Sequence, residues 1–589
     1  MLWVLSLAAL TACNDDFLER LPETEIGADN FFNTEEDLAT YIYSLYSFPG
    51  LDMYNGDEAT DNSVTTGNRE IKTLMTTAAN ATTITSGWDW GTLRDINFFL
   101  EHADKADITE EVRNHYKGIA RFFRAQFYMQ KVKRYSNVPW YDYVLGTNDE
   151  DLYKPSDSRA VIIDHIFDDY QFALEHVTAD VADGEVHKWV VAAYYSRNAL
   201  YEGTFRKYHS ELGLESSAST YLQLAETVSK NVMDNAGYSI YTTGNAASDY
   251  HTLFESQDLT GNPEVIFANI YATDVKNTGD PQYMFGSYEM CMGRDLLESY
   301  LMADGSFFSE QTGNQTMSFV EEFQNRDPRL SQTYAFPGWE LFYTSTYSPG
   351  NTLYVQEFKK NFTGYHQIKG FINSADFDVR SGVDIPVLRY AEVLLNYAEA
   401  KAELGTISQS DLDATVNVLR DRAGMPHLTM AASTDALQAA RYPLVSSDLI
   451  LEIRRERRVE LAVEGRRLDD LNRWAAGNLM EKEPVGMYFP GLGRYDLTGD
   501  GVEDIVLLDA SETIPETKEK NALGATLTYY RVGSVGNISV DMFLTNGTSG
   551  NVVSIEERGT FNSPKHYYRP IPASEIQLNP NLEQVFGWD

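Results

Sequence analysis

Residues 385–405 read IPVLRYAEVLLNYAEAKAELG and begin a run of helical patterns that ends at Trp474. Apolar residues recur at steps of three and four, so they share one helical face: Leu388, Ala391, Leu395, Ala398 and Ala402. A second face carries Tyr390, Leu394, Tyr397 and Leu404. A helix that is apolar on two faces is buried on two sides, and small alanines let neighbouring helices approach closely. This pattern predicts a packed helix that ends at Gly405.

Two further helices and one short helix are predicted after this first helix. The second, 411–423, is followed by Gly424 and Pro426, which are typical stop signals. The third runs from Ser447 to Glu464. Gly465 interrupts the pattern, and a short helix then continues to Trp474.

The third predicted helix carries a run of arginines. Residues 452–464 contain four Arg (454, 455, 457, 458) and four Glu (452, 456, 460, 464), so the segment is neutral. A nucleic-acid site would be net positive. We therefore predict that these side chains form an Arg–Glu lattice that joins adjacent helices through bidentate pairs.

Several segments together resemble a known family. They are PVLRYAEVLLNYAEA (386–400), LRDRAGMP (419–426), RRERRVELAVEGRRLDDLNRW (454–474) and NPNLEQVFGW (579–588). In this order they resemble the RagB/SusD family, the outer-membrane nutrient-binding lipoproteins of Bacteroidota. The resemblance covers essentially the whole mature chain. It implies a mainly α, SusD-like fold: a degenerate tetratricopeptide-like helical scaffold with a loop-rich ligand-binding part and a few short strands.

Composition narrows the range of ligands. The 589 residues include 47 Lys and Arg against 87 Asp and Glu, a net charge of −40. This charge argues against nucleic acid and against electrostatic attachment to an anionic membrane. Tyr, Phe and Trp are plentiful, at 37, 29 and 8, and they supply both cores and flat binding platforms.

The chain begins with an apolar run, MLWVLSLAALTAC, that ends in small residues and Cys13. Leu10 to Cys13 resembles a bacterial lipobox, which predicts a signal peptide over 1–12 and lipidation of Cys13. The protein would then be a surface lipoprotein held at the outer membrane by its lipid anchor. The alternative is an apolar terminus without that role.

The region 13–238 is predicted to be helical. Its patterns cover 35–46, 91–103, 116–135, 159–177, 188–208 and 218–235, and they form helical hairpins. The region 239–589 is more varied. We divide it into a loop-rich part (239–371), a helical core (385–476), an insertion (480–559) and a docked tail (560–589).

Two carboxylates in the segment GDEATD are candidate ligand contacts. Asp57 and Asp61 resemble the DE-x-x-D motif of the family, which lies near the ligand face. They are predicted to accept hydrogen bonds from sugar hydroxyls. Capping of a loop is the first alternative, and an acid/base pair of a glycosidase is the second.

Aromatic residues in loop-like sequence are the other candidate glycan contacts. Trp88 and Trp90 lie in TTITSGWDW, just before a predicted helix. The segment PGWELFYTSTY supplies Trp339, Phe342, Tyr343 and Tyr347. Loops on a rigid scaffold often carry binding function, so these rings are predicted to stack on sugars. The alternative is that they pack the loops onto the scaffold.

The insertion contains an acidic, glycine-containing loop, YDLTGDGVEDI. Asp496, Thr498, Asp500, the Val502 carbonyl and Asp504 follow the oxygen spacing of an EF-type calcium loop. Position twelve is Leu507, so the usual bidentate Glu is missing. The spacing predicts a structural calcium ion, and an acidic turn is the alternative. No other cofactor is expected.

Sequence motifs of catalysis do not occur. There is no Gly-rich phosphate loop, no G-x-S-x-G and no H-E-x-x-H. We therefore expect a binding protein. The resemblance implies a glycan ligand and a SusC-like TonB-dependent transporter as partner. A peptide-binding protein of the RagB type and a surface glycoside hydrolase remain the alternatives.

Overall fold

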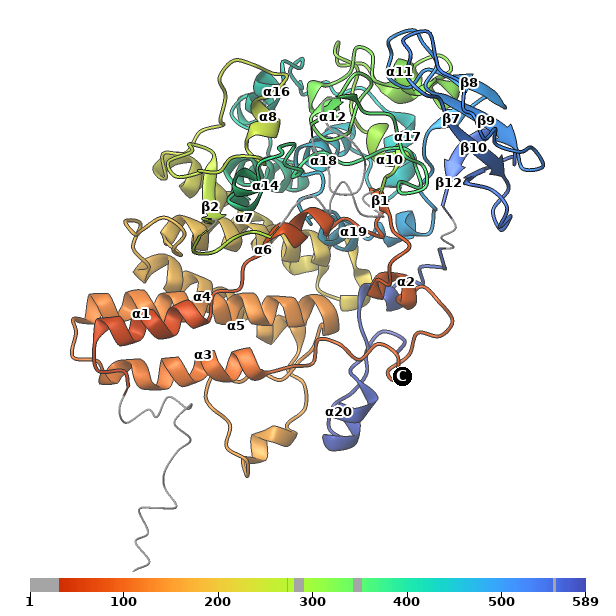
Figure 1. The fold of residues 1–589 in the computed structure, drawn as a ribbon. Coiled ribbons are helices and arrows are strands. Elements are labelled where there is room, and N and C mark those ends of the chain that lie inside the picture. Colours follow the sequence, from red (N-terminus) through yellow and green to blue (C-terminus); the bar gives the residue numbers. More distant parts are fainter. Residues whose placement is uncertain (1–30, 273, 280–290, 343–351, 555–557, 589) are drawn as a thin grey trace, which may run out of the picture.

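The computed structural model describes residues 31–272, 274–279, 291–342, 352–554 and 558–588. Long helices fill the N-terminal half, which forms the lower part of the molecule in Figure 1. They are α1 (Glu35–Ser44), α3 (Gly91–His102), α4 (Glu110–Tyr135), α5 (Arg159–His176), α6 (Lys188–Tyr208) and α7 (Ala218–Asn235), and the short α2 (Glu70–Leu74) lies between α1 and α3 in the sequence.

The C-terminal half lies above them and contains mostly shorter helices (Figure 1). They are α8 (Asp249–Thr252), α10 (Arg294–Leu297), α11 (Phe319–Glu322), α12 (Pro328–Ser331), α13 (Phe377–Ser381), α14 (Tyr390–Leu404), α15 (Gln409–Asp413), α16 (Val416–Ala423), α17 (Ala436–Arg441), α18 (Asp448–Glu460), α19 (Arg467–Arg473) and α20 (Ala573–Leu578).

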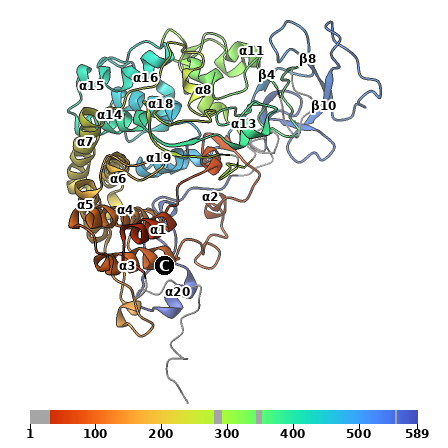
Figure 2. The same ribbon diagram turned by 60° about the vertical axis from the view of Figure 1, so that its left-hand side comes forward.

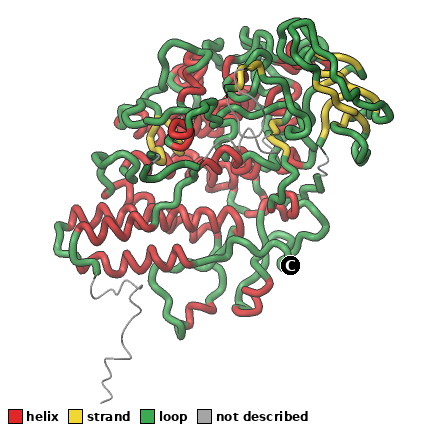
Figure 3. Tube along the Cα trace, in the orientation of Figure 1, coloured by secondary structure: helices red, strands yellow, loops and turns green. Residues whose placement is uncertain are grey.

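The strands are short, and β7 to β12 gather in one sheet at a corner of the molecule (Figure 3). They are β1 (Ser63–Val64), β2 (Val265–Asn269), β3 (Cys291–Met292), β4 (Glu340–Leu341), β5 (Thr352–Leu353), β6 (Ile385–Arg389), β7 (Tyr488–Phe489), β8 (Gly493–Tyr495), β9 (Ile505–Asp509), β10 (Thr528–Gly533), β11 (Met542–Leu544) and β12 (Gly550–Val553).

Helix pairs build the scaffold. α4 packs along α5, α6 packs along α7, and α14 packs across both α6 and α7. Local sequence explains where α1 begins. The Thr34 hydroxyl accepts a hydrogen bond from the Asp37 amide, and the Asp37 carboxylate accepts one from the Thr34 amide. This capping box stabilises the first turn of α1 by about 1 kcal/mol. The predicted mainly α, tetratricopeptide-like scaffold is confirmed.

The helical core differs from the prediction in three places. Ile385–Arg389 is the strand β6, antiparallel to β2, and the helix begins only at Tyr390. Pro386 favours extended backbone before it, and four apolar residues in a row (385–388) suit a buried strand as well as a helix. The helix predicted over 411–423 is divided into α15 and α16. The third helix ends at Glu460, and Val463 beyond it has a positive φ of 56°.

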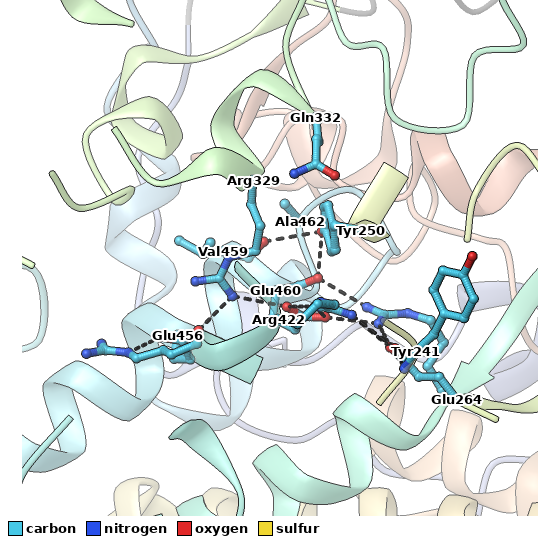
Figure 4. Close-up of polar contacts among 12 residues, drawn as sticks. Tyr241, Tyr250, Glu264, Arg329, Gln332, Arg422, Glu456, Val459, Glu460 and Ala462 are labelled. Atoms are coloured by element: carbon cyan, nitrogen blue, oxygen red, sulfur yellow. Dashed lines mark hydrogen bonds and ion pairs between the residues drawn. The ribbon is translucent and has the colours of Figure 1, made fainter. Parts of the chain in front are cut away.

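A buried ionic lattice joins these core elements (Figure 4). Glu460 of α18 is fully buried and accepts hydrogen bonds from three arginines. Arg422 donates to both of its oxygens at 2.6 Å, and Arg389 and Arg329 donate at 3.0 and 3.1 Å. Those arginines come from α16, the end of β6 and α12. The predicted Arg–Glu lattice is confirmed, and it fixes four elements around one carboxylate.

The insertion folds as a six-stranded mixed sheet in the order β7-β12-β11-β10-β9-β8. β10 runs parallel to both of its neighbours, and the other pairs are antiparallel. One face packs on the scaffold through buried residues such as Ile505, Leu507 and Tyr530. The sheet projects at the upper right in Figure 1. Within the described part of the chain, every helix is too short or too polar to cross a membrane.

Candidate functional site

Asp57 and Asp61 lie in the interior, with 1% and 4% of their surface exposed. Arg467 donates two hydrogen bonds to the Asp61 carboxylate, at 2.7 and 2.6 Å, and a guanidinium nitrogen of Arg458 lies 3.0 Å from the same carboxylate. These two guanidinium groups hold the pKa of Asp61 well below its usual range, although burial opposes them. Asp57 accepts hydrogen bonds from the Asn62 side chain and from the Val463 amide.

These contacts give both aspartates a structural role. They attach the loop after Asn55 to the end of α18, and the backbones touch there: a Cβ added to Gly56 would lie 2.5 Å from the Gly465 Cα. Burial raises the pKa of Asp57, and the bonds from Asn62 and Val463 and the charge of Arg467 oppose it. A carboxylate held inside the protein in this way does not reach a ligand. The predicted sugar contact is therefore replaced by the alternative of loop anchoring.

Trp88 and Trp90 are half-buried and pack on the N-terminal helices. The Trp88 and Tyr135 rings pack edge-on with their centroids 4.8 Å apart, and the Trp90 and Tyr141 rings pack edge-on with their centroids 5.8 Å apart. The ammonium group of Lys131 lies 5.0 Å from the Trp90 ring and donates to the carbonyls of Gly87 and Asp89. Burial lowers the pKa of Lys131 to about 8. These contacts hold the loop on α4 and leave part of both indoles exposed.

Trp339 lies in a different cluster from Trp88 and Trp90. It is half-buried and packs edge-on against Tyr354 at 5.8 Å and Phe371 at 6.2 Å. The structure therefore does not bring the predicted tryptophans into one site. Tyr343, Tyr347 and Cys13 lie outside the described residues.

Around Trp339, four short segments form a surface that we call the loop face: residues 274–279, 336–342, 352–354 and 371–381. The Asn373 side chain ties two of them together, because it accepts the Phe342 amide and donates to the Glu340 carbonyl, both at 2.8 Å. The Thr278 amide donates to the Ser381 carbonyl at 2.9 Å and so connects a third segment, 274–279, to 371–381. Figure 2 labels α13 and β4, which belong to two of these segments, in the upper part of the molecule.

The loop face exposes large apolar side chains. Phe342 is 47% exposed, Phe377 is 49% exposed and Val275 is 89% exposed. Asp376 and Asp378 flank Phe377 and are exposed as well. Exposed rings beside hydrogen-bonding groups suit a ligand that has both apolar and hydroxyl-bearing faces. The sequence prediction included Phe342 but missed Phe377, although an aromatic residue between two aspartates was a usable signal.

The residues predicted to hold calcium form a hydrogen-bonded turn. The Asp496 carboxylate accepts the amides of Gly499 and Gly501 at 2.6 and 2.9 Å. The Asp504 carboxylate accepts the amides of Leu497 and Thr498 at 2.8 and 2.9 Å, and Asp500 accepts the Val502 amide. Nowhere in the described ranges do three His, Cys, Asp or Glu side chains gather so as to hold a metal ion. In this geometry the carboxylates bond to backbone amides of the loop, which favours the acidic turn.

This geometry predicts that calcium does not stabilise the protein. Thermal unfolding followed by circular dichroism in EDTA and in millimolar CaCl2 should give midpoints that agree within about 1 °C. Asp500→Asn serves as a control that removes one predicted ligand. A midpoint that rises by several degrees with calcium, and that loses this rise in Asp500→Asn, would restore the calcium site.

The fold and the loop face together define a class of protein: a helical scaffold that presents a loop-borne binding surface. The SusD family model matches residues 242–588, which is more than half of the chain. The chain therefore belongs to the SusD family.

Individual relatives are distant in sequence but extend over most of the chain. SusD-like protein P2 of Formosa agariphila is 22% identical over 500 residues, covering 81% of this chain and 90% of the relative. SusD-like protein P38 of the same organism is 22% identical, covering 80% and 90%.

Solved structures share the fold. A SusD-like carbohydrate binding protein of Bacteroides fragilis NCTC 9343 superposes with a TM-score of 0.67 at 24% identity, covering 94% of this chain and all of the other. Another SusD-like protein of that strain gives a TM-score of 0.64 at 22% identity, covering 96% and 100%. At these identities the likeness establishes the architecture and leaves the ligand to be argued from the site.

Proposed function

We propose that this protein is a cell-surface lipoprotein that binds an oligosaccharide or polysaccharide and passes it to a SusC-like TonB-dependent transporter of the outer membrane. The observation that carries the proposal is the pair of exposed rings, Phe342 and Phe377, on a loop face anchored to a rigid core. Family membership supports it. The lipobox-like segment ending at Cys13 supports the lipid anchor.

Binding at such a face requires no chemistry. The C–H face of a pyranose ring would lie against a phenyl ring, and hydroxyl groups would donate to the carboxylates of Asp376 and Asp378. An open face of this kind gives moderate affinity, because little of the ligand is enclosed. Moderate affinity suits a protein that must release its ligand to a transporter. We accordingly assign the protein a binding role and not an enzymatic one.

The experiment is a polysaccharide screen by native affinity electrophoresis, using a soluble form that lacks residues 1–13. We expect one class of polysaccharide to slow migration. Reducing-end assays on the same mixtures should detect no new ends, and mass spectrometry of the purified protein should detect no bound peptides. Unchanged migration on every polysaccharide would contradict the proposal. Copurified peptides would favour a RagB-type function, and new reducing ends would favour a hydrolase.

A further inference from the structure

A small pocket with a mixed apolar and polar lining lies outside the loop face. It measures about 240 Å³ and is lined by two short 3₁₀ turns, 308–310 and 314–316, and by the beginning of α17. Ser309, Glu310, Asn314 and Gln315 form one wall, and Asp435, Ala436 and Leu437 form the other. This volume is below the range typical of drug-sized ligands, and it suits a single sugar ring.

Both walls of the cavity are fixed by bonds to the core. Asp435 is 3% exposed; its carboxylate caps α17 through the Leu437 amide at 2.8 Å and pairs with Arg455. Ser309 donates to the same carboxylate at 3.1 Å and so links the two walls. The Gln315 amide donates to Glu298 at 2.9 Å. A site that is already ordered loses little conformational entropy when a ligand binds.

The polar groups of the lining are mainly hydrogen-bond acceptors. Because Arg455 compensates the charge of Asp435, Glu310 supplies the remaining negative charge of the lining. The carboxylate of Glu310 is exposed and has no ion-pair or hydrogen-bond partner among the described residues. Asn314 and Gln315 add amide oxygens, and Ala436 and Leu437 add an apolar surface. A carboxylate can accept two hydroxyl groups at once, which matches a vicinal diol.

From this arrangement we infer that the cavity is a second carbohydrate site, which binds one pyranose unit with its vicinal diol on Glu310 and its C–H face on Ala436 and Leu437. The site is separate from the loop face, so it does not depend on the position proposed there for the polysaccharide. It would allow the protein to hold a branch or chain end of a glycan in addition to the main chain.

The test uses saturation-transfer difference NMR with the methyl glycosides of glucose, galactose, mannose and fucose as probes. We expect transfer to at least one glycoside. In the Phe342→Ala/Phe377→Ala background, which lacks the loop-face rings, Ala436→Trp at an exposed position at the start of α17 should fill the cavity and abolish the transfer. Glu310→Gln should raise the dissociation constant about tenfold, because it removes charge-assisted hydrogen bonds. Ala440→Trp, exposed in the same helix but outside the lining, is the matched control and should keep the transfer.

The experiment separates this site from the loop face. A Phe342→Ala/Phe377→Ala variant should keep the transfer to the glycoside. Absence of transfer to all four glycosides would overturn the inference, as would transfer that survives both Ala436→Trp and Glu310→Gln. Loss of transfer in the loop-face variant would also overturn it. Affinity electrophoresis of the same variants on the polysaccharide reports on the proposed function independently, so the two failures are distinguishable.

Discussion

Replacing Glu460 by glutamine is expected to lower the free energy of unfolding by about 3–5 kcal/mol, the cost typical of breaking a buried ionic network by removing one partner. Glu460 is fully buried and accepts hydrogen bonds from Arg329, Arg389 and Arg422. Glutamine keeps the shape but removes the negative charge, and its amide N–H groups point at guanidinium groups. Three arginines would then share the remaining carboxylates (Figure 4).

Urea unfolding followed by circular dichroism measures this effect. The matched control is Glu512→Gln, an exposed position outside the lattice, which should change stability by less than about 0.5 kcal/mol. A Glu460→Gln protein as stable as the control would show that the lattice does not hold the core elements together.

Asp61→Asn is expected to cost a similar amount, about 3–5 kcal/mol, by leaving Arg458 and Arg467 buried without their shared carboxylate. The loop from Asn55 to Asp61 should also become accessible to proteases, because this carboxylate joins it to the helical core. Asp107→Asn, at an exposed position, is the control. Limited proteolysis and urea unfolding at pH 7 would test both effects, and unchanged resistance to proteolysis would contradict the anchoring role.

The loss in free energy of unfolding caused by Asp61→Asn should depend on pH. The two arginines hold the pKa of Asp61 below the value it has in the unfolded chain. A lowered folded-state pKa gives stability that is fully present above the unfolded pKa and is lost as pH falls toward the folded pKa. The difference between the wild-type protein and Asp61→Asn should therefore be largest near pH 7 and should narrow below about pH 4. A difference that stays constant down to pH 3 would contradict the ion-pair explanation.

Long helices could be predicted from the sequence because their pattern is local. α6 and α7 have the predicted limits, since about twenty residues of apolar spacing outweigh any single exception. Ile385–Arg389 was predicted wrongly because its partner strand, β2, lies about 120 residues earlier and leaves no mark on the local pattern. The arginine run was interpreted correctly because its charge balance is visible in the sequence itself.

The candidate site was harder to predict from the sequence than the long helices were. Asp57 and Asp61 are buried only because Arg458, Arg467 and Val463, some four hundred residues away, pack against their loop. Nothing near GDEATD in the sequence shows this. Trp88 and Trp339 were grouped as one site by residue type, yet they pack on separate clusters. Whether an aromatic side chain faces solvent or a neighbouring element depends on contacts between distant segments, as Phe377 and Trp339 illustrate.

Affinity electrophoresis of Phe342→Ala/Phe377→Ala beside Tyr153→Ala, on the polysaccharide that retards the wild-type protein, tests most directly whether the loop face binds the glycan. Covering an exposed phenyl ring with a sugar face contributes about 1–2 kcal/mol, so each substitution should weaken binding about tenfold. Tyr153 is 55% exposed, which is close to the 47% of Phe342 and the 49% of Phe377, but it lies on the separate turn 150–153. The double variant should lose retardation, and Tyr153→Ala should keep it. Equal retardation of all three proteins would show that the loop face does not bind the glycan.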